Sequence, residues 1–484
     1  MTSALLDRVE PLRVWPHFLA LTRIPRPPKE EEAARAYALA WARDHGFATD
    51  VDAEGNLVVR VPATRDRESA PTVVLQAHLD MVCERDADSP YDPRDGRINV
   101  VLEDDWLVAE GTTLGADNGI GVAAAIAIAE DDEVAHGPLE LLFTVSEEQG
   151  LDGAKALDPE LVTGRLLVNL DGGEKGITIG CAGSIHTFTR VELRPSPVDA
   201  GDLALSVRLH GARGGHSGGD IANGRVNANK ALARVLAHAH SAAPFRLALL
   251  EGGVSRNAIP RESRAVVVLA YERERTFREA AERVLAELRE QHAETDDGIA
   301  LAVELSAAEA ATDTSTTERV LDLLTSTPTG VLAMHPQLPG VVETSTSLTV
   351  VTTADGVLTL GSMTRSANAV TLESVLETIH AIARLAQAEV EVRRSYPPWR
   401  PDVSSRLLAV ARQTYERVLG AEPTLTVVHG GLECAVIGGK LPGVEMISFG
   451  PEIEAPHAPG ERLNVPSTQR FYRLLSALLD DLAR

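Results

Sequence analysis

Three short apolar segments, each followed by acidic or imidazole side chains, constrain the fold of this chain more than any other feature. They span residues 72–78, 139–145 and 166–170, and the stretches between them have helical character. Buried apolar strands that alternate with helices are typical of a largely parallel α/β sheet. The polar groups that follow the strands would then meet at the carboxyl edge of the sheet, where open α/β sheets place their functional sites.

The first segment ends in His78 and Asp80, which are two residues apart. Side chains at this spacing lie on the same face of a strand, so both should point beyond the sheet edge. A histidine that is held by a neighbouring carboxylate is the usual arrangement in a zinc site. Taken alone, the pair is better explained as an ion pair at a strand end, so a metal site requires further ligands.

Five more polar side chains occupy comparable positions. Considered singly, they have simpler explanations: a helix N-cap, a solvated acidic pair, a turn and a surface histidine. Together with His78 they offer the ligands of a two-zinc site, in which one carboxylate bridges the ions and one acid is left as a base. They are Asp117 in the glycine-rich loop 111–121, Glu147 and Glu148 after the second strand, Asp171 after the third, and His457 in the loop 454–460.

The pattern changes between residues 185 and 396. Strands there alternate in polarity, and helices are expected at residues 223–240 and 276–292, which is typical of helices packed on an antiparallel sheet. A second set with the same pattern follows from residue 316 onward. We therefore expect a discontinuous metal-binding catalytic domain, residues 1–184 and 397–484, and one inserted α+β domain, residues 185–396, made of two related halves.

The composition excludes several classes of protein. The 484 residues carry a formal charge of −24, which argues against nucleic acid or an anionic membrane as the main partner. No segment approaches about 18 apolar residues and no signal-peptide pattern is present, so we expect no membrane span and a cytoplasmic location. The three cysteines are far apart and form no C-x-x-C motif, as expected in a reducing compartment.

Six motifs, spread over nearly the whole chain, carry a resemblance to a known family. In order they are QAHLDMVCE, GTTLGADNGIGVA, TVSEEQGLDGA, NLDGGEKGITIGCAG, GARGGHSGGDI and HGGLECAVI. With these motifs the chain resembles the co-catalytic zinc aminopeptidases, dipeptidases and carboxypeptidases, and it is most similar to the bacterial aminoacyl-histidine dipeptidases. The resemblance implies a zinc-peptidase α/β fold in which the inserted domain is a lid over the catalytic domain.

The resemblance also implies a role for each candidate ligand. His78 and Asp171 would bind one Zn²⁺, and Glu148 and His457 would bind the other. Asp117 would bridge the two ions. Two Zn²⁺ per chain are expected, with Co²⁺ or Mn²⁺ as alternatives.

Further roles concern catalysis. Asp80 would orient His78, and Glu147 would be the general base for a water activated by the two metals. His216, in the glycine-rich loop of the inserted domain, would polarise the scissile carbonyl. A cis peptide bond is implied between Asp117 and Asn118.

Four residues match positions that contact substrate in the family. Arg365 and Asn257 would bind the substrate ends, because an arginine fork suits the free carboxylate of a dipeptide. Gly431 lies in a loop that would line the cleft of the catalytic domain. For Glu433, contact with the substrate amino group and a purely structural ion pair are equally acceptable.

The expected activity is therefore hydrolysis of dipeptides of the Xaa-His type, such as β-alanyl-histidine, or of a broader range. An N-acyl amino acid amidohydrolase on the same scaffold is the main alternative, and a non-catalytic, metal-stabilised binding protein is the other. A glycosidase would need two acids but neither His78 nor His457. Small peptides are the expected partners, and both a monomer and a homodimer are compatible with the sequence.

Overall fold

The computed structural model describes residues 13–174 and 176–484, and the chain divides into two compact units. The first unit contains Met1–Cys181, Trp399–Val428 and Leu432–Arg484, and the second contains Ala182–Pro398 and His429–Gly431. The second unit is thus inserted into the first. The short segment 429–431 groups with the second unit, whereas the sequence predicts that all of residues 397–484 belong to the catalytic domain.

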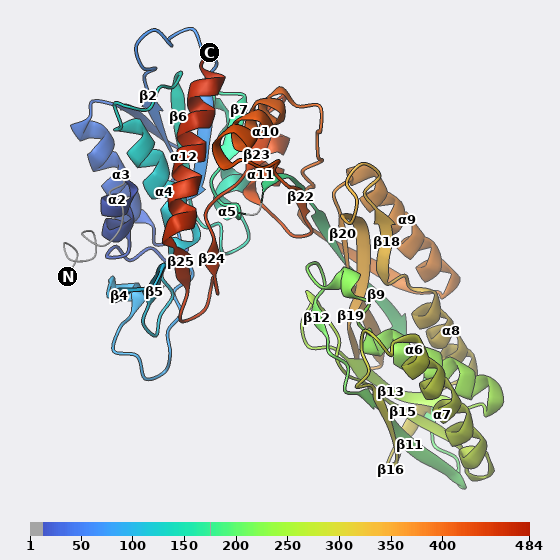
Figure 1. The fold of residues 1–484 in the computed structure, drawn as a ribbon. Coiled ribbons are helices and arrows are strands. Elements are labelled where there is room, and N and C mark those ends of the chain that lie inside the picture. The colour runs from blue at the N-terminus through green and yellow to red at the C-terminus, as the bar shows by residue number, and fades with distance from the viewer. Residues whose placement is uncertain (1–12, 175) are drawn as a thin grey trace. The chain divides into compact units, whose positions relative to one another are not determined.

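The first unit is built on an eight-stranded sheet with the order β1-β2-β6-β3-β7-β23-β8-β22 (Figure 1). Strands β6, β3, β7 and β23 pair with one another in parallel, whereas β1 and β2 extend the sheet in antiparallel pairing and β23 pairs antiparallel with β8. The predicted largely parallel α/β architecture is therefore confirmed. In chain order the strands are β1 (Ala48–Val51), β2 (Leu57–Val61), β3 (Val73–His78), β6 (Leu139–Thr144), β7 (Leu166–Asn169), β8 (Ile177–Cys181), β22 (Leu425–Val428) and β23 (Glu445–Ser448).

Helices cover this sheet. Its central strands β3 and β6 are apolar and buried along their whole length, as expected of parallel strands with helices on both faces. Helix α4, rich in Ala and Ile, packs on β3 and β6, while α2 packs on α4 and α10 packs on α12. The helices are α2 (Val14–Leu21), α3 (Glu32–Asp44), α4 (Ala116–Ala129), α5 (Asp152–Ala156), α10 (Arg406–Leu419), α11 (Glu433–Lys440) and α12 (Val465–Leu482).

Two helices differ from the sequence expectation. The alanine-rich sequence of residues 122–130 predicts a helix there, but helix α4 already begins at Ala116, so Asp117 lies in its first turn. Helix α11 was not expected, because two glycines interrupt its short apolar pattern. The first part of a helix predicted over residues 3–21 lies outside the described residues, and the described part contains α2.

A small four-stranded sheet connects distant parts of the first unit. It consists of β4 (Val100–Glu103), β5 (Trp106–Ala109), β25 (Arg462–Asn464) and β24 (Ile453–Glu454). Strand β25 pairs antiparallel with β5. The turn between β24 and β25 therefore lies beside the segment that leads into α4, and the amide of Gly460 donates to the carbonyl of Thr112 at 3.0 Å.

The main sheet of the second unit is antiparallel, with the order β16-β11-β15-β13-β19-β20-β9-β21, and β18 pairs with β19. The four strands of residues 202–306 form one side of this path, and the later strands together with β9 form the other. The strands are β9 (Gly183–Glu192), β11 (Asp202–His210), β13 (Arg246–Gly252), β15 (Ser263–Ala270), β16 (Ala300–Ser306), β18 (Gly330–Met334), β19 (Val342–Ala354), β20 (Val357–Ser366) and β21 (Glu389–Tyr396).

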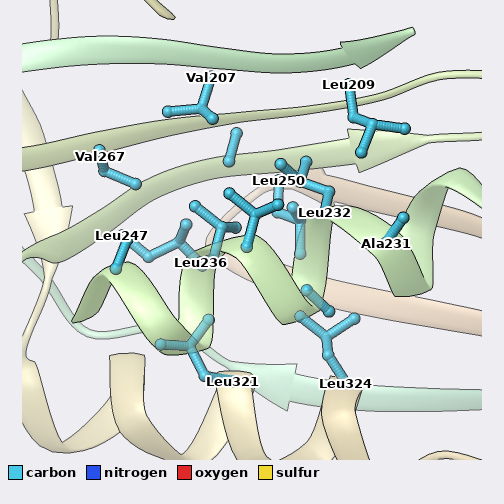
Figure 2. Close-up of a cluster of buried hydrophobic side chains, with 14 of the residues drawn as sticks. Val207, Leu209, Ala231, Leu232, Leu236, Leu247, Leu250, Val267, Leu321 and Leu324 are labelled. Atoms are coloured by element: carbon cyan, nitrogen blue, oxygen red, sulfur yellow. The ribbon is translucent and has the colours of Figure 1, made fainter. Parts of the chain in front are cut away.

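A single layer of helices covers one face of this sheet (Figure 1). The layer consists of α6 (Ala228–Ala242), α7 (Glu274–Gln291), α8 (Thr314–Ser326) and α9 (Ala369–Leu385). Buried residues of α6 recur every three or four positions, so one stripe of the helix faces the strands. Figure 2 shows Leu232 and Leu236 of α6 near Val207 and Val267 of the sheet. Among the described residues, no helix has the length and apolarity needed to cross a membrane.

Replacing Leu232 by Ala should destabilise the second unit by about 2–5 kcal/mol, because the fully buried side chain would leave a cavity in this core. Leu385→Ala is the matched control, since Leu385 is 85% exposed and should change stability by less than about 0.5 kcal/mol. All four tryptophans lie in the first unit, so urea denaturation should be followed by circular dichroism. Equal effects of the two substitutions would contradict this packing.

Candidate metal centre

Loops at the carboxyl ends of β3, β6 and β7 carry most of the candidate ligands. His78 ends β3, Glu147 and Glu148 follow β6, and Asp171 follows β7. The three strands are parallel neighbours, so their carboxyl ends lie at one edge of the sheet. Asp117 reaches the same edge from the first turn of α4, which packs on β3.

His457 arrives from the turn between β24 and β25. The pairing of β25 with β5 places this turn next to the segment that leads to Asp117. His457 adopts a φ of 63°, a left-handed conformation that is uncommon for a residue with a side chain. Its side chain is 49% exposed, whereas that of His78 is 1% exposed. The two histidines therefore approach the cluster from its open and its buried side.

Asp117 lies between the two histidines. Its Oδ1 is 3.1 Å from His78 Nε2, and its Oδ2 is 3.2 Å from His457 Nε2. His457 Nε2 also lies 3.0 Å from Glu148 Oε1, and His78 Nε2 lies 4.0 Å from Asp171 Oδ1. Ligand atoms of His78, Asp117 and Glu148 all lie within 4.8 Å of one another. This is the arrangement expected of a carboxylate that bridges two metal ions, each with one histidine and one further acid.

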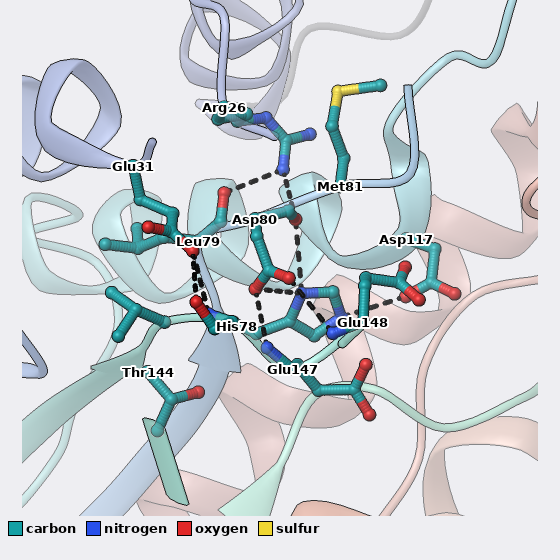
Figure 3. A network of polar contacts seen from close by, with 12 residues as sticks. Arg26, Glu31, His78, Leu79, Asp80, Met81, Asp117, Thr144, Glu147 and Glu148 are labelled. Carbon is teal, nitrogen blue, oxygen red and sulfur yellow. Dashed lines mark hydrogen bonds and ion pairs between the residues drawn. The ribbon is translucent and has the colours of Figure 1, made fainter. Parts of the chain in front are cut away.

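Asp80 connects two of the ligand loops (Figure 3). One carboxylate oxygen lies 3.4 Å from His78 Nδ1, and the Asp80 carbonyl lies 3.2 Å from the same nitrogen. The carboxylate also accepts the backbone N–H groups of Glu147 and Glu148, each at 3.0 Å. Asp80 therefore holds the imidazole from behind and fixes the turn that presents the two glutamates.

The charges in this cluster indicate that it is built to hold cations. Burial would raise the pKa of Asp117, but hydrogen bonds from His457 and His78 hold it well below its usual value. Burial and the nearby Asp117 carboxylate raise the pKa of Asp171. Hydrogen bonds to Asp117 and Glu148 raise the pKa of His457 to about 10. Metal ligands must be deprotonated, so a bound cation would take the place of the protons that these groups retain.

In the part of the chain that the structure describes, no imidazole pairs with Glu147, although it follows the same strand as Glu148. Burial raises its pKa to about 8; His78 opposes this shift, and the carboxylates of Glu433 and Glu148 add to it. The turn that presents Glu147 is held by a residue that the sequence did not indicate. Glu31 accepts the backbone N–H of Ser146 at 2.8 Å and its hydroxyl at 3.0 Å. The cis peptide bond that the resemblance implies between residues 117 and 118 is present.

Glu433 lies fully buried at the start of α11, in the same unit as the metal centre. Its Oε2 accepts from Gln76 at 2.6 Å and from the Thr144 hydroxyl at 2.8 Å, whereas Oε1 has no hydrogen-bond partner. Burial raises the pKa of Glu433 to about 7, despite the opposing charge of His78. No basic side chain bonds to it among the described residues, so the structural ion pair considered above is absent.

The remaining candidates, His216, Asn257, Arg365 and Gly431, all lie in the second unit. His216 and Asn257 are adjacent, because β12 (Gly215–His216) pairs with β14 (Ala258–Ile259) and the Ser217 amide donates to the Asn257 carbonyl at 2.8 Å. Arg365 lies near the end of β20 and is 3% exposed. A Cβ at Gly218 would lie 3.1 Å from His216 and 3.2 Å from Arg365, so this glycine lets the two side chains approach.

Three residues of this second cluster were not indicated by the sequence. The Tyr396 hydroxyl accepts from Arg365 at 3.2 Å, and His429 Nε2 lies 2.7 Å from the Ser345 hydroxyl. Burial, together with Arg365 and His216, lowers the pKa of His429 to about 4, so this imidazole is neutral. Buried nitrogen atoms of Arg365 (Nε) and His429 (Nδ1) have no hydrogen-bond partner among the residues that the structure describes. The cluster thus offers unpaired polar groups around one permanent positive charge.

Comparisons with known proteins identify the class to which this chain belongs. The sequence model of the protein family described as Peptidase family M20/M25/M40 matches residues 74–481 of this chain. The cytosol non-specific dipeptidase of Escherichia coli (strain K12) is 36% identical over 479 residues, which cover 99% of each chain. The crystal structure of aminoacylhistidine dipeptidase from Vibrio alginolyticus superposes with a TM-score of 0.93 at 35% identity, covering 98% of this chain and 97% of that one.

A more distant structure, aminopeptidase PepT from Bacillus cereus ATCC 10987, has a TM-score of 0.56 at 18% identity and shares the fold, with 98% of both chains covered. The chain belongs to the peptidase family M20/M25/M40. It is a metallopeptidase, and hence a hydrolase, homologous to dipeptidases over its full length. The resemblance that its motifs carry is therefore confirmed at the level of the family.

Substituting Asp117 by Asn should weaken the binding of both metal ions by more than about 100-fold. Mutating a residue that only hydrogen-bonds to a metal ligand already lowers metal affinity about 10–100-fold, and Asp117 would be a ligand itself. Metal content after dialysis should fall together for both ions because the two would share this carboxylate. Asp481→Asn is the control, because Asp481 pairs with Arg417 and Thr414 away from the cluster. Loss of a single ion would contradict the bridging position of Asp117.

Proposed function

We propose that this protein is a dinuclear metal-dependent dipeptidase that hydrolyses Xaa-His dipeptides, such as β-alanyl-histidine, within a broader range of dipeptides. The observation that carries the proposal is the position of Asp117, whose two oxygens face two different histidines. The neighbouring Glu147 side chain has no hydrogen-bond partner within residues 13–174 and 176–484. The names of the two full-length relatives, a non-specific dipeptidase and an aminoacylhistidine dipeptidase, support the substrate class.

In this proposal His78 and Asp171 would hold one Zn²⁺, Glu148 and His457 would hold the other, and Asp117 would contribute to both. Co²⁺ or Mn²⁺ would fit the same nitrogen and oxygen ligands. Bound metal ions would supply the Lewis acidity that makes a water molecule nucleophilic at neutral pH.

The protein's own groups then transfer the proton and hold the ligands. Glu147 accepts the proton of the attacking water and returns it to the nitrogen that leaves when the peptide bond breaks. A carboxylate that serves in this way must not itself be a metal ligand, and in this proposal Glu147 is left unligated beside the ligand Glu148. Asp80 keeps His78 in one orientation through Nδ1 and keeps Glu147 in place through its backbone N–H.

The second cluster fits the carboxylate end of a dipeptide. Arg365 has a buried Nε without a partner, and the neighbouring His429 is neutral, so an anion here would be stabilised by charge-assisted hydrogen bonds. Asn257 would also bind a substrate end, and Gly431 would line the substrate cleft, as the resemblance implies. His216 would polarise the scissile carbonyl, as the resemblance implies.

Glu433 favours a dipeptide over an N-acyl amino acid. Its free oxygen Oε1 is a buried acceptor that a substrate ammonium group would satisfy and that an acyl group would leave unpaired. A non-catalytic binding protein would have no use for an unligated Glu147. We further propose a cytoplasmic location, consistent with the name of the Escherichia coli relative, with small peptides as partners of a monomer or homodimer.

Replacing Glu147 by Gln should lower kcat by about 10²–10⁴-fold, because the amide cannot accept the proton of water. Metal content should remain at the wild-type level, and Glu103→Gln, at the exposed last residue of β4, should leave both quantities unchanged. Loss of metal together with activity would instead make Glu147 a ligand.

Assays of the metal-replete enzyme with β-alanyl-histidine, a panel of α-dipeptides and N-acetyl amino acids should show hydrolysis of the dipeptides only. Metal analysis of the same preparation should give two ions per chain. If only the acetylated compounds were hydrolysed, the amidohydrolase alternative would be correct.

Removing the Arg365 guanidinium by Arg365→Met should lower kcat/KM for a dipeptide by about 10–100-fold, since hydrogen bonds to charged groups contribute about 1.5–3 kcal/mol. The corresponding dipeptide amide lacks the carboxylate, so wild type and variant should cleave it at similar rates. Arg190→Met, an exposed arginine that pairs with Glu391, is the control. An equal loss with both substrates would contradict carboxylate recognition by Arg365.

A further inference from the structure

A buried arginine lies beneath the metal centre, in the proline-rich segment that precedes α3. Arg26 is 1% exposed, although arginine is rarely buried without partners. Its Nη1 donates to the carbonyls of Leu79 at 2.9 Å and Asp80 at 2.8 Å (Figure 3). Its Nη2 donates to the carbonyl of Gly115 at 2.5 Å. All three acceptors are backbone groups, so the side chain serves the course of the main chain.

The three carbonyls belong to the two loops that carry His78 and Asp117. Leu79 directly follows His78, and Gly115 precedes Asp117 by two residues. One planar guanidinium therefore joins these loops at the place where His78 Nε2 and Asp117 Oδ1 are 3.1 Å apart. Because the donors of a guanidinium form a rigid fork, the spacing of the two loops is set more tightly than a lysine could set it.

Glu461 holds the same segment from its amide side. Its two carboxylate oxygens accept four consecutive backbone N–H groups, those of residues 114–117, at 2.8, 3.0, 2.8 and 3.2 Å. Glu461 is 2% exposed and lies four residues after His457. It thereby ties the loop of His457 to the segment of Asp117, whose side chains meet at 3.2 Å.

Two glycines leave the space that Arg26 occupies. A Cβ built at Gly115 would lie 2.5 Å from Arg26 Nη2, and one at Gly119 would lie 2.6 Å from the same atom. Gly115 also has a φ of 71°, but Gly119 has ordinary helical geometry, so only space requires a glycine at position 119. The two glycines that flank Asp117 in the sequence therefore leave the space that the Arg26 guanidinium fills.

We propose that Arg26 and Glu461 are paired positioning residues that hold residues 114–117 by their carbonyl and amide groups, respectively, and so set the metal affinity of the centre without touching metal or substrate. The inference rests on the dinuclear site proposed above. Arg26 would fix the distance between His78 and Asp117, and Glu461 would fix the distance between Asp117 and His457.

The test is a Co²⁺ titration of the metal-free full-length protein, followed by calorimetry and by the visible absorption of bound cobalt. Arg26→Met and Glu461→Gln should each weaken Co²⁺ binding by about 10–100-fold and alter the cobalt spectrum, as loss of a ligand's supporting group does. Arg60→Met is the matched control, since Arg60 also joins segments of the first unit through Glu140 and the Leu161 carbonyl. It should lower the thermal midpoint but leave Co²⁺ affinity and spectrum unchanged.

Gly119→Ala provides a second route that keeps every charge. The added methyl group should displace the guanidinium and reproduce the weaker Co²⁺ binding, whereas Gly439→Ala, in open space on α11, should not. If Arg26→Met does not fold, the Co²⁺ affinity of Gly119→Ala alone tests the inference. Wild-type Co²⁺ affinity in Gly119→Ala or in a folded Arg26→Met would overturn the inference. Failure of the wild-type protein to bind two ions would instead overturn the proposed function.

Discussion

The contact of one carboxylate with two imidazoles is the interaction on which the rest of this structure depends. Asp117 faces His78 on one side and His457 on the other. The two histidines are far apart in the sequence, one in its first part and one near its end. Each contact requires its own piece of architecture. Parallel β3 and the helix α4 that packs on it bring Asp117 to His78, and the small sheet in which β25 pairs with β5 brings His457 to Asp117.

Concentrating buried acids in this way has a cost that the protein alone does not offset. Carboxylates of Asp80, Asp117, Glu148 and Asp171 share a small volume with two imidazoles, and burial together with the neighbouring Asp117 carboxylate raises the pKa of Asp171. Divalent cations would remove that conflict, so part of the free energy of metal binding would appear as stability of the folded first unit. Backbone contacts made by Asp80, Arg26 and Glu461 keep the loops in place against this repulsion.

Much of the fold could be predicted from the sequence because its signals are local. The apolar strands before His78, Glu147 and Asp171 were predicted close to their observed bounds, and the helices of the inserted unit follow clear periodic patterns. The start of α4 and the whole of α11 were missed, because glycines obscure the helical pattern and burial against the sheet outweighs their low helix propensity.

Prediction of the site has a similar limit. His78 and its candidate co-ligands could be named because they end strands or lie in recognisable motifs, and the structure brings them together. Arg26, Glu31 and Glu461 could not, since each acts on backbone groups of a distant loop and leaves no spacing pattern in the sequence. His429 lies in a recognised motif, but its role could not be predicted. Its pKa is lowered by burial and by the neighbouring Arg365, and both depend on the folded chain.

Anomalous X-ray scattering from crystals of the zinc-loaded protein tests the central claim most directly. The account predicts two zinc peaks about 3.5–4 Å apart, one on each side of the Asp117 carboxylate, with His78 bound to one ion and His457 to the other. A single peak, or two peaks of which only one contacts Asp117, would contradict it.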